Sequence, residues 1–223
     1  RQAVRSLEKM RIDVIKGGTG ITYPNSATVS ARVDINDTVR LGMIRLVKRT
    51  LSGADADPYT SVVSASRKIS TEPIGPSFIG MGHTDLEHDI REVPGFVPIE
   101  KYSNDMKAFP GEIGKVENIR FILTTLFTPW ADAATNVDVG SWKSTGAEAP
   151  DVYPIVVVSP EAYAVVPLKG KNGVTPFMVY PKPQTGDELG MKGHAGWKTA
   201  QTALILDDTR MNRMEVLCTN VPS

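Results

Sequence analysis

Residues 152–158 of the chain read VYPIVVV, an unbroken apolar run rich in β-branched residues. An apolar run without polar alternation is typical of a strand that is buried on both faces. The residues PEAY at 160–163 predict a helical turn, because a proline at the first helical position has no N–H to lose. The sequence therefore predicts a fold with a buried strand in its second half.

Two stretches show the periodicity of amphipathic helices. Residues 1–16 have apolar side chains near helical spacing, and GGTG at 17–20 is expected to end this helix with glycines at positive φ. A clearer helix begins near residue 39, with Asn36 or Asp37 as its N-cap and Gly53 as its stop. Its apolar stripe consists of Val39, Met43, Leu46, Val47 and Leu51.

Short apolar runs predict most of the remaining structure as strands. These runs lie at residues 62–63, 78–81, 97–102, 119–123, 174–180, 197–206 and 211–219. Asp207–Thr209 is expected to form the turn between the last two strands, and Thr84 or Asp85 to cap a short helix that ends before Pro94. Strands outnumber helices, so the predicted fold class is mixed α+β.

Residues 128–151 are rich in Gly, Ala, Ser, Thr and Asp and show no periodicity, which predicts a long surface loop. Two tryptophans, Trp130 and Trp142, lie in this segment. Exposed aromatic residues on loops are typical of contacts with partner proteins. The alternative, that both rings fold back onto their own domain, is equally consistent with the sequence.

Composition excludes several classes of function. The 223 residues contain 25 Lys and Arg against 25 Asp and Glu, which argues against nucleic-acid binding by bulk charge and against a polybasic membrane binder. The single cysteine, Cys218, excludes an internal disulfide framework and is expected to be a small core residue. The longest apolar run, Ile155–Val158, is far shorter than the roughly 20 residues that cross a bilayer.

The densest group of metal-capable side chains lies between His83 and Asp89. A metal-dependent hydrolase would use His83, Asp85 and His88. Residues two apart on a helix face different directions, however, so His83 and Asp85 are not expected to aim at one ion. The sequence also lacks a G-x-S-x-G nucleophile elbow. It therefore predicts no enzyme, no cofactor and no metal site, with the hydrolase as a minor alternative.

Four basic residues, Arg40, Arg45, Lys48 and Arg49, lie off the apolar stripe of the second helix. A basic helical face can contact phosphate, although a solvated face is the simpler interpretation. The sequence does not determine which way this face points.

Several ordered segments carry a family resemblance. They are FIGMGHTDLEHDIR at 78–91, FPGEIGKVENIRF at 109–121, YPIVV at 153–157, AYAV at 162–165, DELGMKGHAGWKT at 187–199, ALILDD at 203–208 and RME at 213–215. In order and spacing they resemble the major capsid proteins of tailed bacteriophages, and specifically the family of short-tailed coliphages of the N-four type. The resemblance covers about two thirds of the chain, from residue 78 onward. Glu188 stands where the family has proline, and Ala164 where it has glycine.

The resemblance implies a Hong Kong 97-like capsid fold with two domains. Residues 1–35 and 181–223 would form the peripheral domain, which contains the end of the long spine helix and the closing strands. Residues 36–180 would form the axial domain. The N-terminal arm and the extended loop of such folds are expected to be absent from this chain, which would make it a fragment of a longer subunit.

The resemblance also implies a structural function in the virion. Hexamers and pentamers of the chain would form an icosahedral shell, assembled in the host cytoplasm, around double-stranded DNA bound non-specifically. Portal, scaffolding and decoration proteins are possible partners, and no membrane is involved. Trp130 and Trp142 become candidate inter-subunit contacts, and the four basic residues a candidate DNA-facing or inter-subunit patch. The alternatives are an encapsulin-like compartment shell and the hydrolase.

Overall fold

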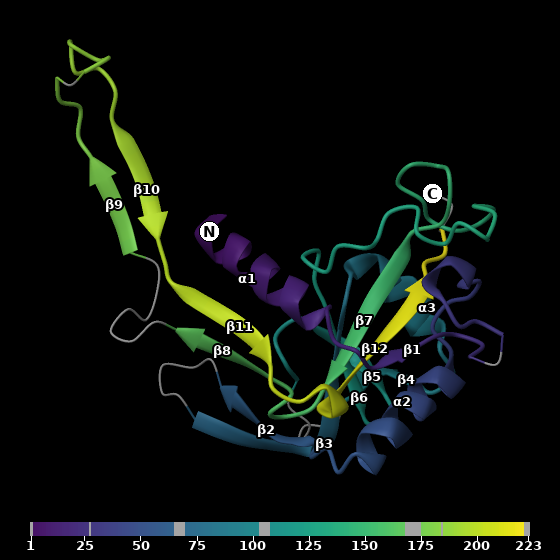
Figure 1. Cartoon of the computed structure of the whole chain (residues 1–223). Helices are drawn as coiled ribbons and strands as arrows, with labels where there is room; N and C mark the ends of the chain where they lie inside the picture. Colours follow the sequence, from purple (N-terminus) through teal and green to yellow (C-terminus); the bar gives the residue numbers. More distant parts are fainter. Residues whose placement is uncertain are drawn as a thin grey trace.

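The structure, a computed structural model, describes residues 2–26, 28–64, 70–102, 108–167, 175–183 and 185–220. An eight-stranded mixed sheet forms the body of the molecule, in the order β1-β12-β7-β3-β6-β5-β4, with β2 paired to β3 (Figure 1). Its strands are β1 (Ile21–Thr22), β2 (Tyr59–Ser64), β3 (Ser70–Gly82), β4 (Phe96–Pro98), β5 (Glu112–Val116), β6 (Ile119–Leu123), β7 (Val152–Val158) and β12 (Met211–Leu217).

Three α-helices accompany the sheet: α1 (Gln2–Ile15), α2 (Leu41–Gly53) and α3 (Glu87–Glu92). Short 3-10 helices lie at Arg32–Asp34, Thr84–Leu86, Ile99–Lys101 and Asp208–Arg210. The mixed class and the excess of strands agree with the prediction. Within the described part of the chain, no helix has the length and apolarity that a bilayer-crossing segment needs.

β7 is the buried strand that the sequence predicts, and all seven of its residues are buried. It pairs antiparallel with β12 on one side and with β3 on the other. Alternate side chains enter different cores: Ile155 and Val157 pack in the core that contains α2, while Val156 and Val158 pack in the core that contains Ile12 of α1. Because both faces are covered, every position of the strand is apolar.

α2 follows the predicted stripe but not the predicted cap. Met43, Val47 and Leu51 are buried against the body, as expected from their spacing. Leu46, which was also assigned to the stripe, is only half-buried, and Ile44, which was not, is fully buried. The N-cap residue is Arg40, which makes no side-chain capping hydrogen bond, so neither Asn36 nor Asp37 caps the helix. The prediction failed because the Asp37 carboxylate binds elsewhere: it accepts from the Thr38 amide at 2.8 Å and pairs with Arg40.

α1 ends before Gly17 as predicted, but the following glycines have a different role. The glycines at positive φ lie elsewhere in the described chain, not at residues 17–20. A Cβ on Gly18 would lie 3.0 Å from Cε of Met211, and a Cβ on Gly20 would lie 3.0 Å from the Met211 carbonyl oxygen. The glycines are therefore needed because β12 passes close to this segment, not because the backbone is left-handed.

One turn prediction is confirmed and one is wrong. Asp207 caps a short 3-10 helix that forms the expected turn between β11 (Gln201–Ile205) and β12, although these strands do not pair with each other: β11 pairs with β8 (Tyr163–Pro167) and β12 with β7. The segment Pro160–Ala162 is a tight turn instead of the start of a helix. Glu161 has a φ of +66° there, and β8 begins directly afterwards.

A long projection extends from the body (Figure 1). β8 and β11 form its base beside α1, and β9 (Thr175–Val179) pairs antiparallel with β10 (His194–Lys198) beyond them. Only two residues separate β10 from β11, so the outer hairpin continues away from the body. We call this outer hairpin, residues 175–183 and 185–198, the limb.

The expected domain boundaries cut across the central sheet. β1 and β12 come from the two chain ends assigned to the peripheral domain, while β3 and β7 come from residues 36–180. All four strands nevertheless belong to one sheet, with β12 between β1 and β7. The two segments thus supply neighbouring strands of the sheet, with β1 at its edge.

Candidate assembly surfaces

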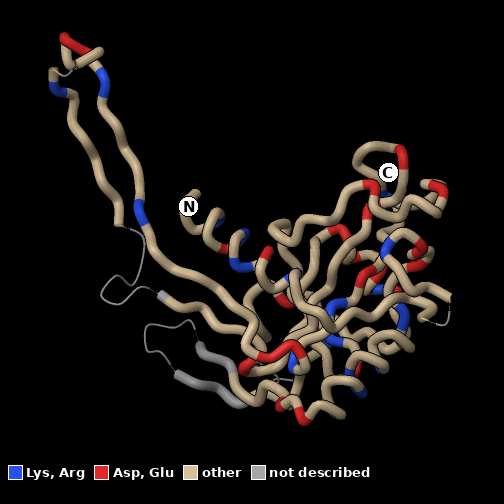
Figure 2. Tube along the Cα trace, in the orientation of Figure 1, with Lys and Arg blue, Asp and Glu red and all other residues tan. Residues whose placement is uncertain are grey.

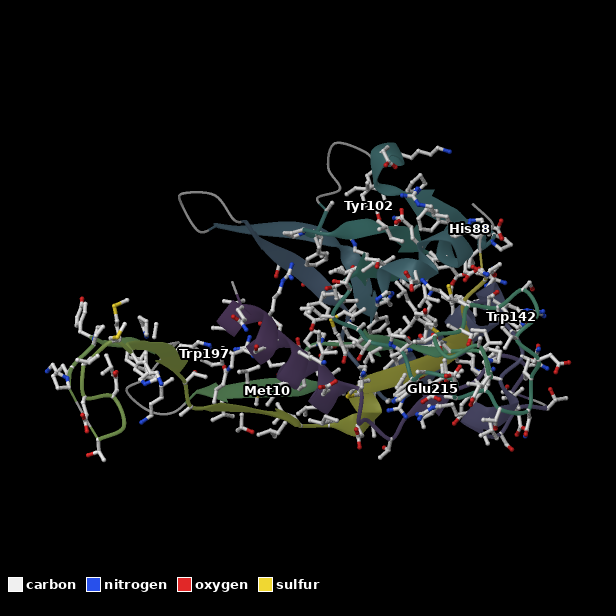
Figure 3. The ribbon with its side chains drawn as sticks, turned by 90° about the horizontal axis from the view of Figure 1, so that it is seen from above. Met10, His88, Tyr102, Trp142, Trp197 and Glu215 are labelled. Carbon is white, nitrogen blue, oxygen red and sulfur yellow. The ribbon has the colours of Figure 1, made fainter. Side chains whose placement is uncertain are left out.

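The limb exposes most of its large apolar side chains. Met178, Leu189 and Met191 have exposed fractions of 63%, 82% and 76%, and Phe177, Val179, Tyr180 and Trp197 are exposed as well. Figure 3 shows Trp197 at the opposite end of the molecule from Trp142 and Glu215 of the body. Extended apolar surface on a folded chain typically marks a site of interaction with another molecule. The limb is therefore the leading candidate for an assembly surface.

The limb has little support within its own chain. Among the described strands, β9 and β10 pair only with each other, over five residue pairs. An isolated two-stranded hairpin is marginally stable in water, and its outer edges leave backbone N–H and C=O groups open to a further strand. A second surface that covered the limb would therefore stabilise it.

Glu215 lies at the centre of a buried ion cluster in the body. Its carboxylate accepts two hydrogen bonds of 2.7 Å from Arg32 and one of 2.8 Å from Nε of Arg213. Arg213 also donates to the main-chain carbonyls of Lys16 and Gly18, directly after α1. Because Glu215 is fully buried, each of these donors compensates for lost hydration. The cluster fixes the end of α1 against β12.

Both loop tryptophans pack on their own chain. The Trp130 ring stacks on the Arg32 guanidinium, with 3.7 Å between the guanidinium carbon and the ring centroid, and its main chain bridges to Val152. Trp142 bridges to Thr219, and both rings are half-buried against a small core that includes Leu217. Both rings thus pack on their own domain, which is the alternative to partner contacts that the sequence left open. Their predicted role as inter-subunit contacts stays a prediction.

The candidate basic patch is largely engaged in ion pairs within the chain. Arg40 pairs with Asp37, and Arg45 and Lys48 both pair with Glu117, at 2.6 Å and 3.5 Å. Arg49 is exposed on the same helix. Figure 2 shows basic and acidic residues interspersed over the body. The four cations therefore lie on or directly before α2, and three of them are paired with carboxylates of the same chain.

The structure brings His83 and Asp85 together but leaves His88 apart. The Asp85 amide donates to Nδ1 of His83 at 3.1 Å, and the Asp85 carboxylate lies 3.3 Å from the same nitrogen. The two residues meet because His83 precedes the helix as its N-cap, a position that the sequence assigned to Thr84 or Asp85. His88 instead faces Glu92, at 3.5 Å. Among the described residues, no three His, Cys, Asp or Glu side chains converge to hold a metal ion.

The environment of Asp85 is structural. Burial would raise the pKa of Asp85, but hydrogen bonds from Lys143 and Tyr153 outweigh that effect and lower the pKa. Burial lowers the pKa of His83, which favours the neutral ring that accepts the amide proton. Burial also raises the pKa of the Cys218 thiol to about 12, as expected of a core cysteine. Asp85 thereby ties the long loop, through Lys143, to β7, through Tyr153.

Three buried carboxylates were not identified from the sequence: Glu215, Glu112 and Asp151. Glu112 accepts from the Tyr102 hydroxyl at 2.6 Å and from Arg120 at 3.4 Å, and Asp151 accepts from the Asp132 amide at 2.9 Å and from the Thr145 hydroxyl at 2.6 Å. One sequence signal could have indicated the buried Glu215: Arg213 and Glu215 form a pair of opposite charges within a strand that also contains Met211, Met214, Val216 and Leu217. Such a pair is equally common on a solvated strand face, so its burial depends on the rest of the fold.

The fold, a mixed sheet covered on both faces with a long β projection, is similar to that of a solved phage capsid chain. A chain from the acid-stable capsid structure of Helicobacter pylori bacteriophage KHP30 superposes with a TM-score of 0.53. The alignment covers 97% of the present chain and 65% of the KHP30 chain, at 10% sequence identity. At this identity the likeness establishes the fold alone.

A sequence relative points in the same direction. The major capsid protein of Pseudomonas phage KPP21 is 25% identical over 198 residues, which cover 84% of the present chain and 50% of that protein. The chain thus spans about half the length of the curated relative that it matches. No protein-family model matches the chain.

Proposed function

We propose that the chain is the structural major capsid protein of a tailed bacteriophage, which self-assembles into an icosahedral shell around double-stranded DNA. The observation that carries the proposal is the capsid fold, matched over 97% of the chain. The relationship to a phage major capsid protein supports it independently. The role is structural, because a shell needs repeating contacts between subunits, not a reaction centre.

The proposal extends to a finer assignment. We place the chain in the short-tailed coliphage N-four-like family with a Hong Kong 97-like fold, in which residues 1–35 and 181–223 form the peripheral domain and residues 36–180 the axial domain. Subunits form hexamers and pentamers in the host cytoplasm. Portal, scaffolding and decoration proteins are further partners in the virion.

The charge distribution is compatible with such a shell. The net charge is zero, so many copies can pack together without accumulated repulsion. Packaged DNA would bind to local groups of cations, because the chain has no net positive charge to attract it. The exposed basic residues of α2 are the candidates, with Arg40, Arg45, Lys48 and Arg49 facing DNA or a neighbouring subunit.

The test is the assembly state of the full-length gene product, measured by light scattering and negative-stain microscopy of the same fraction. We expect closed particles of megadalton mass. Nucleic acid inside particles from infected cells indicates a virion shell, whereas a protein cargo indicates the encapsulin-like alternative. A stable monomer or dimer at several salt concentrations and pH values contradicts both.

A variant that lacks the limb tests whether the limb is needed for assembly. Pro167 lies directly opposite Gln201 in the β8–β11 pair, so an Asn-Gly turn that replaces residues 168–200 closes this hairpin in its existing register. We expect this variant to keep its circular dichroism spectrum and its cooperative unfolding, and to form no shells. Shells of normal yield from the limbless variant would show that the limb is dispensable for assembly.

A further inference from the structure

The apex of the limb, residues 185–191, is a structured turn that presents an apolar side chain. The Asp187 carboxylate accepts from the main-chain amides of Met191 and Lys192 at 3.1 and 2.8 Å, and the Asp187 carbonyl accepts from Gly190. Gly190 has a φ of +60°, and a Cβ there would lie 2.8 Å from the Pro183 nitrogen. Leu189 is held on this turn with 82% of its surface exposed. A preorganised apolar side chain binds with a reduced entropy cost.

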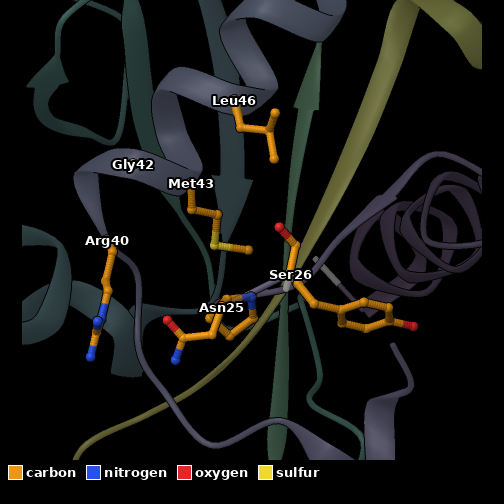
Figure 4. A pocket seen from close by; sticks show the side chains of 8 residues that line it. Asn25, Ser26, Arg40, Gly42, Met43 and Leu46 are labelled. Atoms are coloured by element: carbon orange, nitrogen blue, oxygen red, sulfur yellow. The ribbon is translucent and has the colours of Figure 1, made fainter. Parts of the chain in front are cut away.

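A pocket of about 330 Å³ lies on α2, at the other end of the molecule. Met43 and Leu46 point from α2 toward the segment that holds Asn25 and Ser26, and Arg40 stands at the rim (Figure 4). This volume is near the lower end of the roughly 300–1,000 Å³ of small-ligand sites. It has room for one or two side chains, with an apolar floor and a polar rim.

Apex and pocket are complementary in both polarity and charge. The apex combines Leu189 with the exposed Glu188, and the pocket combines Met43 and Leu46 with Arg40, whose exposed side-chain fraction is 61%. Arg40 pairs through Nε with Asp37, but a guanidinium has five N–H donors and can bind a second carboxylate. Lys182 and Lys192 flank the apex in the sequence, so the complementarity is local to Glu188.

We propose that the limb apex of one copy docks into the α2 pocket of a second copy, with Leu189 inside the pocket and Glu188 beside Arg40. The inference rests on the proposed shell function and names one of its contacts. Apex and pocket of one chain lie far apart (Figure 1), so the contact forms between copies. Because the two surfaces differ, the contact is heterologous and closes only when repeated around a ring.

Gly42 offers a way to close the pocket without disturbing the fold. Gly42 lines the pocket, and a Cβ there meets nothing within 4 Å. Leucine is also a better helix former than glycine. We expect Gly42→Leu in the full-length protein to raise the concentration needed for half-maximal assembly at least tenfold. The matched control is Gly53→Leu, which places the same side chain in equally open space at the other end of α2.

Disulfide trapping tests the contact directly. Chains carrying Leu189→Cys are mixed with differently tagged chains carrying Ser26→Cys, and the only native cysteine, Cys218, is buried. We expect a disulfide between the two kinds of chain on mild oxidation. Pairing Leu189→Cys with Thr50→Cys, on an exposed position of α2 that does not line the pocket, is expected to give at least tenfold less product.

The outcomes separate this inference from the proposed function. Shells that form normally with Gly42→Leu, together with no Leu189–Ser26 cross-link, overturn the docking contact and leave the shell function standing. If Leu189→Asp abolishes assembly while Gly42→Leu does not, the apex docks on another surface and the inference is equally wrong. If the wild-type protein forms no shells, the proposed function fails, and the disulfide between free copies still decides whether apex and pocket meet.

Discussion

Strands β7 and β9 have similar sequences and opposite surroundings. β7 (VYPIVVV) and β9 (TPFMV) each combine a proline with bulky apolar residues. All seven residues of β7 are buried between two strands and two cores, whereas all five residues of β9 are exposed. A β-rich apolar pattern thus indicates a surface that requires burial. It does not indicate whether the covering surface belongs to the same chain.

The largest effect that follows from this comparison concerns the ion cluster of the body. Glu215→Ala would leave the Arg32 and Arg213 guanidiniums without their shared carboxylate in a buried site. Removal of one partner from a buried ion pair typically costs about 3–5 kcal/mol. We expect a loss of that size in the free energy of unfolding, measured by urea denaturation of the unassembled chain.

The control for Glu215 is Glu117→Ala. Glu117 pairs with Arg45 and Lys48 at the surface, where an ion pair contributes about 0–1 kcal/mol. Equal losses for the two variants would show that the cluster around Glu215 is not what holds α1 to the body.

A second prediction applies one substitution to both strands. Val157→Ala in β7 removes two methyl groups from a fully buried side chain and is expected to cost about 2 kcal/mol of unfolding free energy. Val179→Ala in β9 removes the same groups from a half-exposed side chain and is expected to cost less than about 0.5 kcal/mol in the unassembled chain. Denaturation of the two variants side by side measures the difference.

The same pair of variants can contradict the comparison. If Val179→Ala destabilises the unassembled chain as much as Val157→Ala does, the limb is already covered by its own chain. The limb would then offer no apolar surface to a partner.

The smallest effect concerns pH. Burial lowers the pKa of His83 below its ordinary value of 6.5, so the folded chain binds this proton less readily than the unfolded chain. The neutral His83 ring therefore makes its full contribution to the free energy of unfolding above pH 6.5, and this contribution declines as the pH falls below that value. The lowered pKa of Asp85 acts in a separate window, below its ordinary value of 3.8.

His83→Asn isolates the histidine contribution. Asparagine is a good N-cap, accepts a hydrogen bond and does not titrate in this range. We expect the unfolding free energy of the wild-type chain to fall more steeply between pH 7.5 and pH 5 than that of His83→Asn, in urea titrations at each pH. Identical slopes for the two chains would contradict the prediction.

Local structure with a strong periodic signal was predictable from the sequence. The stripe of α2, the buried run of β7 and the end of α1 before Gly17 all lie where the pattern indicates. These features depend on residues close in sequence, whose spacing alone decides which face is apolar. The resemblance to phage capsid proteins also came from the sequence, and the capsid fold agrees with it.

Features that depend on distant residues were not predictable. Two helix caps differ from the prediction: Asp37 pairs with Arg40 instead of capping α2, and His83 takes the N-cap position that was expected of Thr84 or Asp85. The strands on either side of the Asp207–Thr209 turn do not pair with each other, because β11 pairs with β8 and β12 pairs with β7. Trp130 faces inward because Arg32, nearly a hundred residues away, provides a flat cation for its ring.

The sequence by itself determined the α+β class, the buried central strand, the absence of a disulfide framework and the capsid-like order of segments. Only the tertiary structure decided that the two chain ends meet in the central sheet, that Glu215 is buried with its arginines, and that the limb stands away from the body. The physical reason is that periodicity specifies which side chains need burial. Periodicity does not specify which surface covers those side chains, because any complementary surface can do so, including one on another copy.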